Sequence, residues 1–87
     1  MNELQVKVVD LVANGAPAAG VSVTLGSCFV DDLDYDSLRV VELLLEIERA
    51  FDLAPIELTD VAHLETVGEL CGWLADRVPR APGNASR

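Results

Sequence analysis

The longest amphipathic pattern in the chain covers residues 38–51, LRVVELLLEIERAF. Successive residues of an α-helix lie about 100° apart around its axis, and this spacing divides the apolar side chains into two groups. The broad group is expected to face a hydrophobic core: Val40, Leu43, Leu44, Ile47, Ala50 and Phe51. The narrow group contains Leu38, Val41 and Leu45, and is flanked by Glu42, Glu48 and Arg49. One apolar face suffices for the core of a small domain, so the narrow group is expected to be a docking surface, unless a loop covers it.

Three further segments are predicted to be helical. Residues 3–13 carry apolar side chains at helical spacing and end at Asn14 and Gly15, a common stop signal. Residues 56–64 indicate a short helix capped by Thr59 or Asp60. A last helix is expected to start at a capping box and to run to about Arg77. The capping box and the core-facing residues of this helix are Thr66 with Glu69, and Val67, Leu70, Cys71, Leu74 and Val78.

The segment between the first two predicted helices is rich in Gly, Ala and Pro over residues 15–26, which favours a loop. Residues 21–25 alternate like a strand but have no second strand to pair with, so an extended loop is expected, with Phe29 and Leu33 turned inward. The predicted fold is therefore all-α, a small bundle of three main helices and one short helix with a long loop after the first. Residues 1–78 are expected to form one domain, and residues 79–87 are expected to form a flexible C-terminal tail.

Composition narrows the function. The 87 residues suffice for one core, and 51% hydrophobic residues exclude a disordered chain. The formal net charge of −9 argues against nucleic-acid binding and suits partners with basic patches. Cys28 and Cys71 lack metal-ligand spacing and are expected to be reduced. No signal peptide or membrane-length apolar run is visible, so we expect a cytoplasmic monomer.

The candidate chemistry lies at Asp36-Ser37-Leu38, where an acidic run meets the long helix. The first N–H groups of a helix have no partner inside the helix and favour a bound anion such as phosphate. Ser37 is therefore a candidate for phosphorylation or for a phosphodiester bond. The position alone does not separate these possibilities from simple capping, which is the role of most serines at helix starts.

The surrounding residues resemble the acyl carrier protein family. The resemblance rests on residues 29–38 (FVDDLDYDSL), on Val41-Glu42-Leu43 and on Glu48-x-x-Phe51-Asp52, and it extends over residues 27–74. It implies that Ser37 receives 4′-phosphopantetheine from coenzyme A, added by a magnesium-dependent phosphopantetheinyl transferase. Asp36 would assist the metal of the transferase and cap the helix. The arm would carry acyl groups as thioesters, so that the protein acts as a carrier rather than an enzyme.

The resemblance also implies a partner-binding face and a shelter for the cargo. Leu38, Val41, Glu42, Leu45 and Glu48 would contact ketosynthase and acyltransferase-type enzymes, and the broad apolar group would line a slot for the acyl chain. Two residues depart from the family pattern: Asp34 replaces a common glycine, and Arg39 replaces a residue that is usually acidic in fatty-acid carriers. The departure at Arg39 changes the face that partners contact and favours polyketide or another specialised pathway. A fatty-acid carrier and an aminoacyl or peptidyl carrier remain alternatives.

The sequence also contains partial signals for a calcium-binding loop and for a hydrolase. Asp32, Asp34 and Asp36 have the spacing of an EF-hand calcium loop, but Ser37 and Leu43 occupy the places of its required glycine and glutamate. A hydrolase using Ser37 and His63 lacks the Gly-x-Ser-x-Gly motif and the usual scaffold. Neither a metal site nor a catalytic residue is therefore expected.

Overall fold

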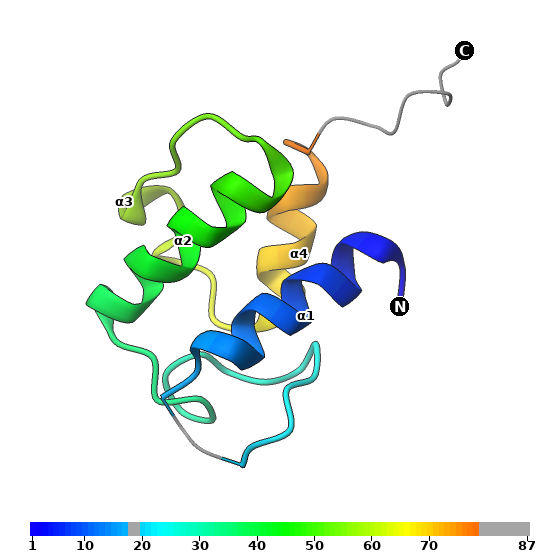
Figure 1. Ribbon diagram of the computed structural model, residues 1–87. Coiled ribbons are helices and arrows are strands. Elements are labelled where there is room, and N and C mark those ends of the chain that lie inside the picture. The colour runs from blue at the N-terminus through cyan, green and yellow to red at the C-terminus, as the bar shows by residue number, and fades with distance from the viewer. Residues whose placement is uncertain (18–19, 79–87) are drawn as a thin grey trace.

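The computed structural model describes residues 1–17 and 20–78, and this part of the chain folds into four helices without a strand (Figure 1). The helices are α1 (Glu3–Gly15), α2 (Ser37–Phe51), α3 (Leu58–Val61) and α4 (Val67–Ala75). α1 packs against both α2 and α4, and the short α3 packs against α2. The prediction of three main helices, one short helix and a long loop after the first is confirmed. No helix within these residues is both long enough and apolar enough to span a membrane.

The core forms where apolar stripes of the three long helices meet inward-facing residues of the long loop. Buried side chains from the helices alternate with polar residues at helical spacing, as the sequence pattern predicts. The buried apolar residues are Val8, Val12, Phe29, Leu33, Tyr35, Leu43, Leu44, Ile47, Val61, Val67, Leu70, Cys71 and Leu74. Phe29 and Leu33 are turned inward as expected, whereas Ala50 is exposed rather than part of the core face.

The long loop is tied to the start of α4 by backbone hydrogen bonds. The Val67 N–H donates to the Ser27 carbonyl oxygen at 3.0 Å, and the Gly68 N–H donates to the Leu25 carbonyl oxygen at 2.7 Å. A Cβ at Gly68 would lie 3.0 Å from that Leu25 oxygen, tighter than most Cβ contacts, so the close approach favours glycine. Residues 21–24 belong to no helix or strand and Leu25 begins a turn, so this segment is a loop as predicted, and Val23 and Leu25 pack onto the core.

The helix ends differ from the predictions in three places. α1 continues through Gly15 and begins with an Asn2–Gln5 capping box that the sequence analysis missed. The predicted cap of α3 at Thr59 or Asp60 is wrong: Glu57 is the N-cap residue, and its N–H donates to the Asp60 carboxylate. α4 begins at the predicted Thr66–Glu69 capping box but ends at Ala75 rather than at about Arg77. The predicted flexible tail, residues 79–87, lies outside the described residues.

Candidate functional site

Ser37 is the first residue of α2, and its side chain is exposed. Asp36 precedes it in an extended conformation, which lets one carboxylate oxygen turn back onto the helix. That oxygen, Oδ1, accepts a hydrogen bond from the Arg39 N–H at 2.9 Å. Asp36 is therefore the N-cap of α2, as the sequence predicted. Ser37 needs no part in capping, and its hydroxyl has no hydrogen-bond partner within residues 1–17 and 20–78.

The first turn of α2 leaves backbone donors unpaired. The Arg39 N–H is taken by the Asp36 side chain, and the Val40 N–H is taken by the Asp36 carbonyl oxygen at 2.9 Å. Among the described residues, nothing accepts from the N–H groups of Ser37 and Leu38. Unpaired N–H groups and the positive end of the helix dipole together favour a phosphate bound next to the Ser37 hydroxyl.

Side chains of the acidic segment hold this helix start in place. The Tyr35 hydroxyl donates to the Val12 carbonyl oxygen of α1 at 2.8 Å, and the Tyr35 ring packs perpendicular to that of Phe29 at 5.6 Å between centroids. The Asp32 carboxylate accepts from the Cys28 N–H at 2.7 Å. Burial raises the pKa of Tyr35 to about 12, so its hydroxyl remains a donor at neutral pH. The contacts of Tyr35 and Asp32 thus fix the segment that presents Ser37.

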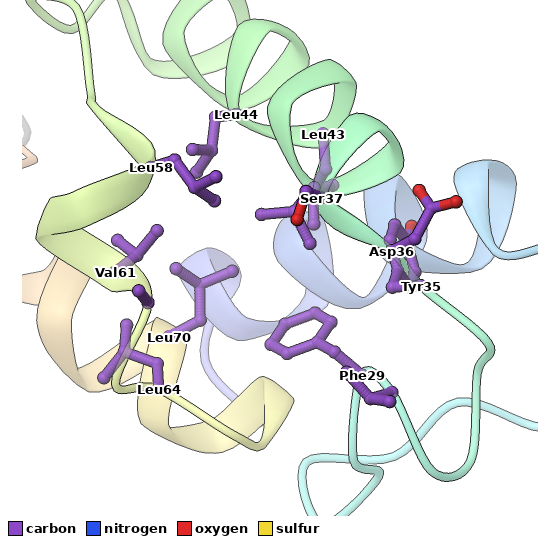
Figure 2. A pocket seen from close by; sticks show the side chains of 13 residues that line it. Phe29, Tyr35, Asp36, Ser37, Leu43, Leu44, Leu58, Val61, Leu64 and Leu70 are labelled. Atoms are coloured by element: carbon purple, nitrogen blue, oxygen red, sulfur yellow. The ribbon is translucent and has the colours of Figure 1, made fainter.

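An apolar cavity of about 430 Å³ opens beside Ser37, within the roughly 300–1,000 Å³ typical of small-molecule sites. α2, α3, α4 and the long loop all contribute to its walls. Figure 2 shows Phe29, Leu44, Leu58, Val61 and Leu70 converging on this space, with Ser37 at its rim and the Asp36 carboxylate directed away from it. Because its walls are almost entirely apolar, the cavity suits a hydrocarbon chain better than a polar ligand.

The second apolar group of α2 is exposed, as the sequence predicted. The exposed fractions are 67% for Leu38, 39% for Val41 and 46% for Leu45. Glu42 is also exposed, but Glu48 is half-buried and its carboxylate accepts from the Ile56 N–H at 2.7 Å. Glu48 therefore fixes the segment that leads into α3, in addition to any contact with a partner.

Comparison with known proteins identifies the family. A family profile described as "Phosphopantetheine attachment site" matches residues 6–74. The chain is also 40% identical over 78 residues to an acyl carrier protein of Amoebophilus asiaticus, covering 90% of this chain and 96% of that protein. The chain belongs to the acyl carrier protein family. Its cofactor is phosphopantetheine.

Two further acyl carrier proteins show the same extent of similarity. The carrier is 40% identical over 72 residues to that of Syntrophobacter fumaroxidans, covering 83% of this chain and 88% of the relative. It is 35% identical over 80 residues to that of Phenylobacterium zucineum, covering 90% and 98%. The residues of this carrier fit the cofactor, because an exposed hydroxyl, two unpaired N–H groups and an apolar cavity meet at one place.

The residues considered for a calcium loop or for a Ser37–His63 pair make other contacts or lie away from the site. Asp32 and Asp36 both bind backbone N–H groups, and the described residues contain no group of three or more His, Cys, Asp or Glu side chains that could hold a metal ion. His63 is exposed and does not line the cavity beside Ser37. Neither the calcium loop nor the Ser37–His63 pair is therefore formed by the described residues.

Several parts of the carrier that support the site are not evident from its sequence. Tyr35 belongs to the acidic run before Ser37, yet the residue is buried, with only 2% of its surface exposed. Asp34 adopts a left-handed conformation with φ of 60°, and its position as the family's usual glycine was the available signal for this. The contact from Tyr35 to Val12 spans 23 residues of sequence and leaves no local signal.

Proposed function

We propose that Ser37 is the residue to which 4′-phosphopantetheine is joined, and that the carrier holds acyl groups for partner enzymes. The observation that carries the proposal is the exposed Ser37 hydroxyl at the open first turn of α2, beside an apolar cavity. The attached arm supplies a terminal thiol that carries acyl groups as thioesters. The carrier has no turnover of its own and depends on a transferase and on acyl-handling enzymes.

The residues around Ser37 have distinct roles in this proposal. The N–H groups of Ser37 and Leu38 stabilise the phosphate charge. Asp36 uses Oδ1 to cap α2, which leaves its second carboxylate oxygen free to assist the magnesium ion of the transferase. The cavity shelters an acyl chain, and burial of each CH₂ group contributes about 0.8 kcal/mol. Leu38, Val41, Glu42, Leu45 and Glu48 form the face that partner enzymes contact.

Ser22 and Ser27, the other serines among the described residues, provide the control for this assignment. Ser22 is exposed but lies in the long loop, and Ser27 is buried with 7% exposed and bonds to the Thr24 N–H. We expect incubation with coenzyme A, Mg²⁺ and a broad-specificity phosphopantetheinyl transferase to add one phosphopantetheine to the wild-type chain and to Ser22→Ala, measured by intact mass. Ser37→Ala should stay unmodified. A modified Ser37→Ala, or an unmodified wild type, would refute the assignment.

A specialised pathway such as polyketide assembly is the setting we propose, with fatty-acid synthesis as the alternative. Arg39 supports the specialised pathway, because this arginine places a positive charge on the face next to Ser37. The free thiols of Cys28 and Cys71 support a reducing, cytoplasmic environment. The test compares the rate of acyl transfer from the loaded carrier to a polyketide ketosynthase with the rate to a fatty-acid ketosynthase. Faster transfer to the fatty-acid enzyme would contradict the proposal.

A further inference from the structure

Arg39 occupies an unusual position for helix stability. In α1 and α4 the third helical residue, Gln5 or Glu69, accepts a hydrogen bond from the N-cap N–H and completes a capping box. In α3 the corresponding Asp60 accepts from Glu57 in the same way. In α2 this position is Arg39, whose side chain has no acceptor atom. A cation in the first turn also opposes the helix dipole. Helix stability therefore does not account for an arginine here.

The guanidinium of Arg39 is available for contact with another molecule. Its nearest acidic partner is Glu42, with 3.9 Å between Arg39 Nη1 and Glu42 Oε1, and both side chains are more than half exposed. Exposed pairs of this kind contribute little to stability. Arg39 lies beside Leu38, which is 67% exposed, and two residues after Ser37. An enzyme that acts on a group joined to Ser37 approaches this same surface.

The charge of α2 differs from that of the chain as a whole. The helix contains three glutamates and two arginines, so its formal charge is −1, while the whole chain carries −9. Glu42 and Glu46 each lie near an arginine of α2, and Glu48 binds the Ile56 N–H. The exposed face of α2 therefore presents apolar side chains and one cation close to Ser37, rather than a uniformly acidic surface.

We infer that Arg39 is a specificity-determining residue, and that the acyl-handling enzymes served by this carrier place an acidic side chain opposite it, next to an apolar pocket for Leu38. This inference rests on the proposed function of Ser37. An acidic group at that position attracts Arg39 in the cognate complex, whereas a basic group there repels it, so one residue discriminates between partners.

Arg49 provides a matched control within the same helix. It lies ten residues further along α2, about 15 Å from Arg39 along the axis, and pairs with Glu46 at 3.5 Å. Its place in the last turn suits the helix dipole. Arg39→Gln and Arg49→Gln remove the same charge, but the first supplies the missing capping-box acceptor and the second removes a favourable cation. The two substitutions are therefore expected to have opposite effects on stability.

The experiment uses the full chain, loaded with phosphopantetheine and acylated, and the ketosynthases encoded in the same genome as probes. Loading is first verified by mass, so a failure of the proposed function is seen separately. For the ketosynthase that the wild type serves best, Arg39→Gln should lower kcat/KM for acyl transfer roughly tenfold, while its Tm stays level or rises. Arg39→Lys should restore most of the rate. Arg49→Gln should lower Tm by roughly 2–6 °C and should lower kcat/KM much less than Arg39→Gln does.

Four results would overturn the inference. The first is that Arg39→Gln has the same kcat/KM for acyl transfer as the wild type, which would show that no partner group recognises Arg39. The second is an equal loss of transfer in Arg49→Gln, which would indicate a response to net charge alone. The third is a properly loaded wild type that serves none of these ketosynthases, which would exclude the partner class. A loss of transfer that follows a loss of Tm in Arg39→Gln would likewise assign this residue to the fold.

Discussion

Tyr35→Phe tests the contact that fixes the site to α1. The substitution keeps the buried ring and its perpendicular packing on Phe29 but removes the hydroxyl, which donates to the Val12 carbonyl oxygen at 2.8 Å. A buried hydrogen bond contributes about 0.5–1.5 kcal/mol, and a carbonyl left without a partner adds to the loss. We expect Tyr35→Phe to unfold with a free energy lower by ~1.5 kcal/mol at pH 7, and with a Tm lower by ~6–12 °C.

The pH dependence of this difference has a definite sign. Burial raises the pKa of Tyr35 from 10.0 to about 12, so the folded state holds the phenolic proton more tightly than the unfolded state. The advantage of the wild type is therefore complete below pH 10 and declines as the pH rises towards 12. Since each unit between the two pKa values corresponds to ~1.4 kcal/mol, a difference of ~1.5 kcal/mol disappears near pH 11.

The measurement is urea unfolding of both proteins, followed by circular dichroism, at pH 7, 9, 10 and 11. Burial also raises the pKa values of Cys28 and Cys71, but both thiols are present in each protein, so their contribution cancels in the difference. Equal stability at pH 7 would show that the hydroxyl contributes nothing. A difference that stays constant up to pH 11 would show that the phenol is not protected by burial, and either result would refute the reasoning.

Two further predictions concern the acidic loop and the partner-binding face. Asp34 has φ of 60°, a conformation that costs a residue with a Cβ about 1–2 kcal/mol; Asp34→Ala should therefore unfold at lower urea concentration than Asp34→Gly, and equal midpoints would exclude strain there. Leu38→Asp places a carboxylate in the first turn of α2, where the dipole favours it, so Tm should not fall while ketosynthase use drops about tenfold. Val6→Asp, which alters an exposed valine of α1, should leave transfer unchanged.

The sequence predicts the long helices well because their signals are local. The spacing of Leu43, Leu44 and Ile47 defines the buried face of α2, and Thr66 with Glu69 defines the start of α4. The cap of α3 was predicted wrongly because Glu57 is an uncommon cap residue, and the choice among neighbouring polar residues depends on how the segment packs against α2. Ala50 was assigned to the core by its wheel position, but it is exposed, because wheel position alone does not say how far the core extends along α2.

The candidate site was predictable in part for the same reason. Asp36 and Ser37 are adjacent in sequence, and a helix start determines the surroundings of both. The cavity beside Ser37 could not be derived in this way. Its walls come from Phe29, Leu44 and Leu70, which lie on separate elements, and from Leu58 on α3. The Glu48 carboxylate also accepts from the Ile56 N–H and so ties α2 to the segment before α3, a contact that helical spacing does not reveal.

The long loop explains why the first N–H groups of α2 are unpaired while those of α4 are hydrogen-bonded. At α4, loop carbonyl oxygens accept from the N–H groups of Val67 and Gly68, and the Thr66 hydroxyl accepts from that of Glu69. These donors are no longer available to a ligand. At its other end the same loop is held by the Tyr35 side chain, which binds α1 and leaves the first donors of α2 unpaired. An anchor made by a side chain thus secures Ser37 without consuming the N–H groups that a phosphate requires.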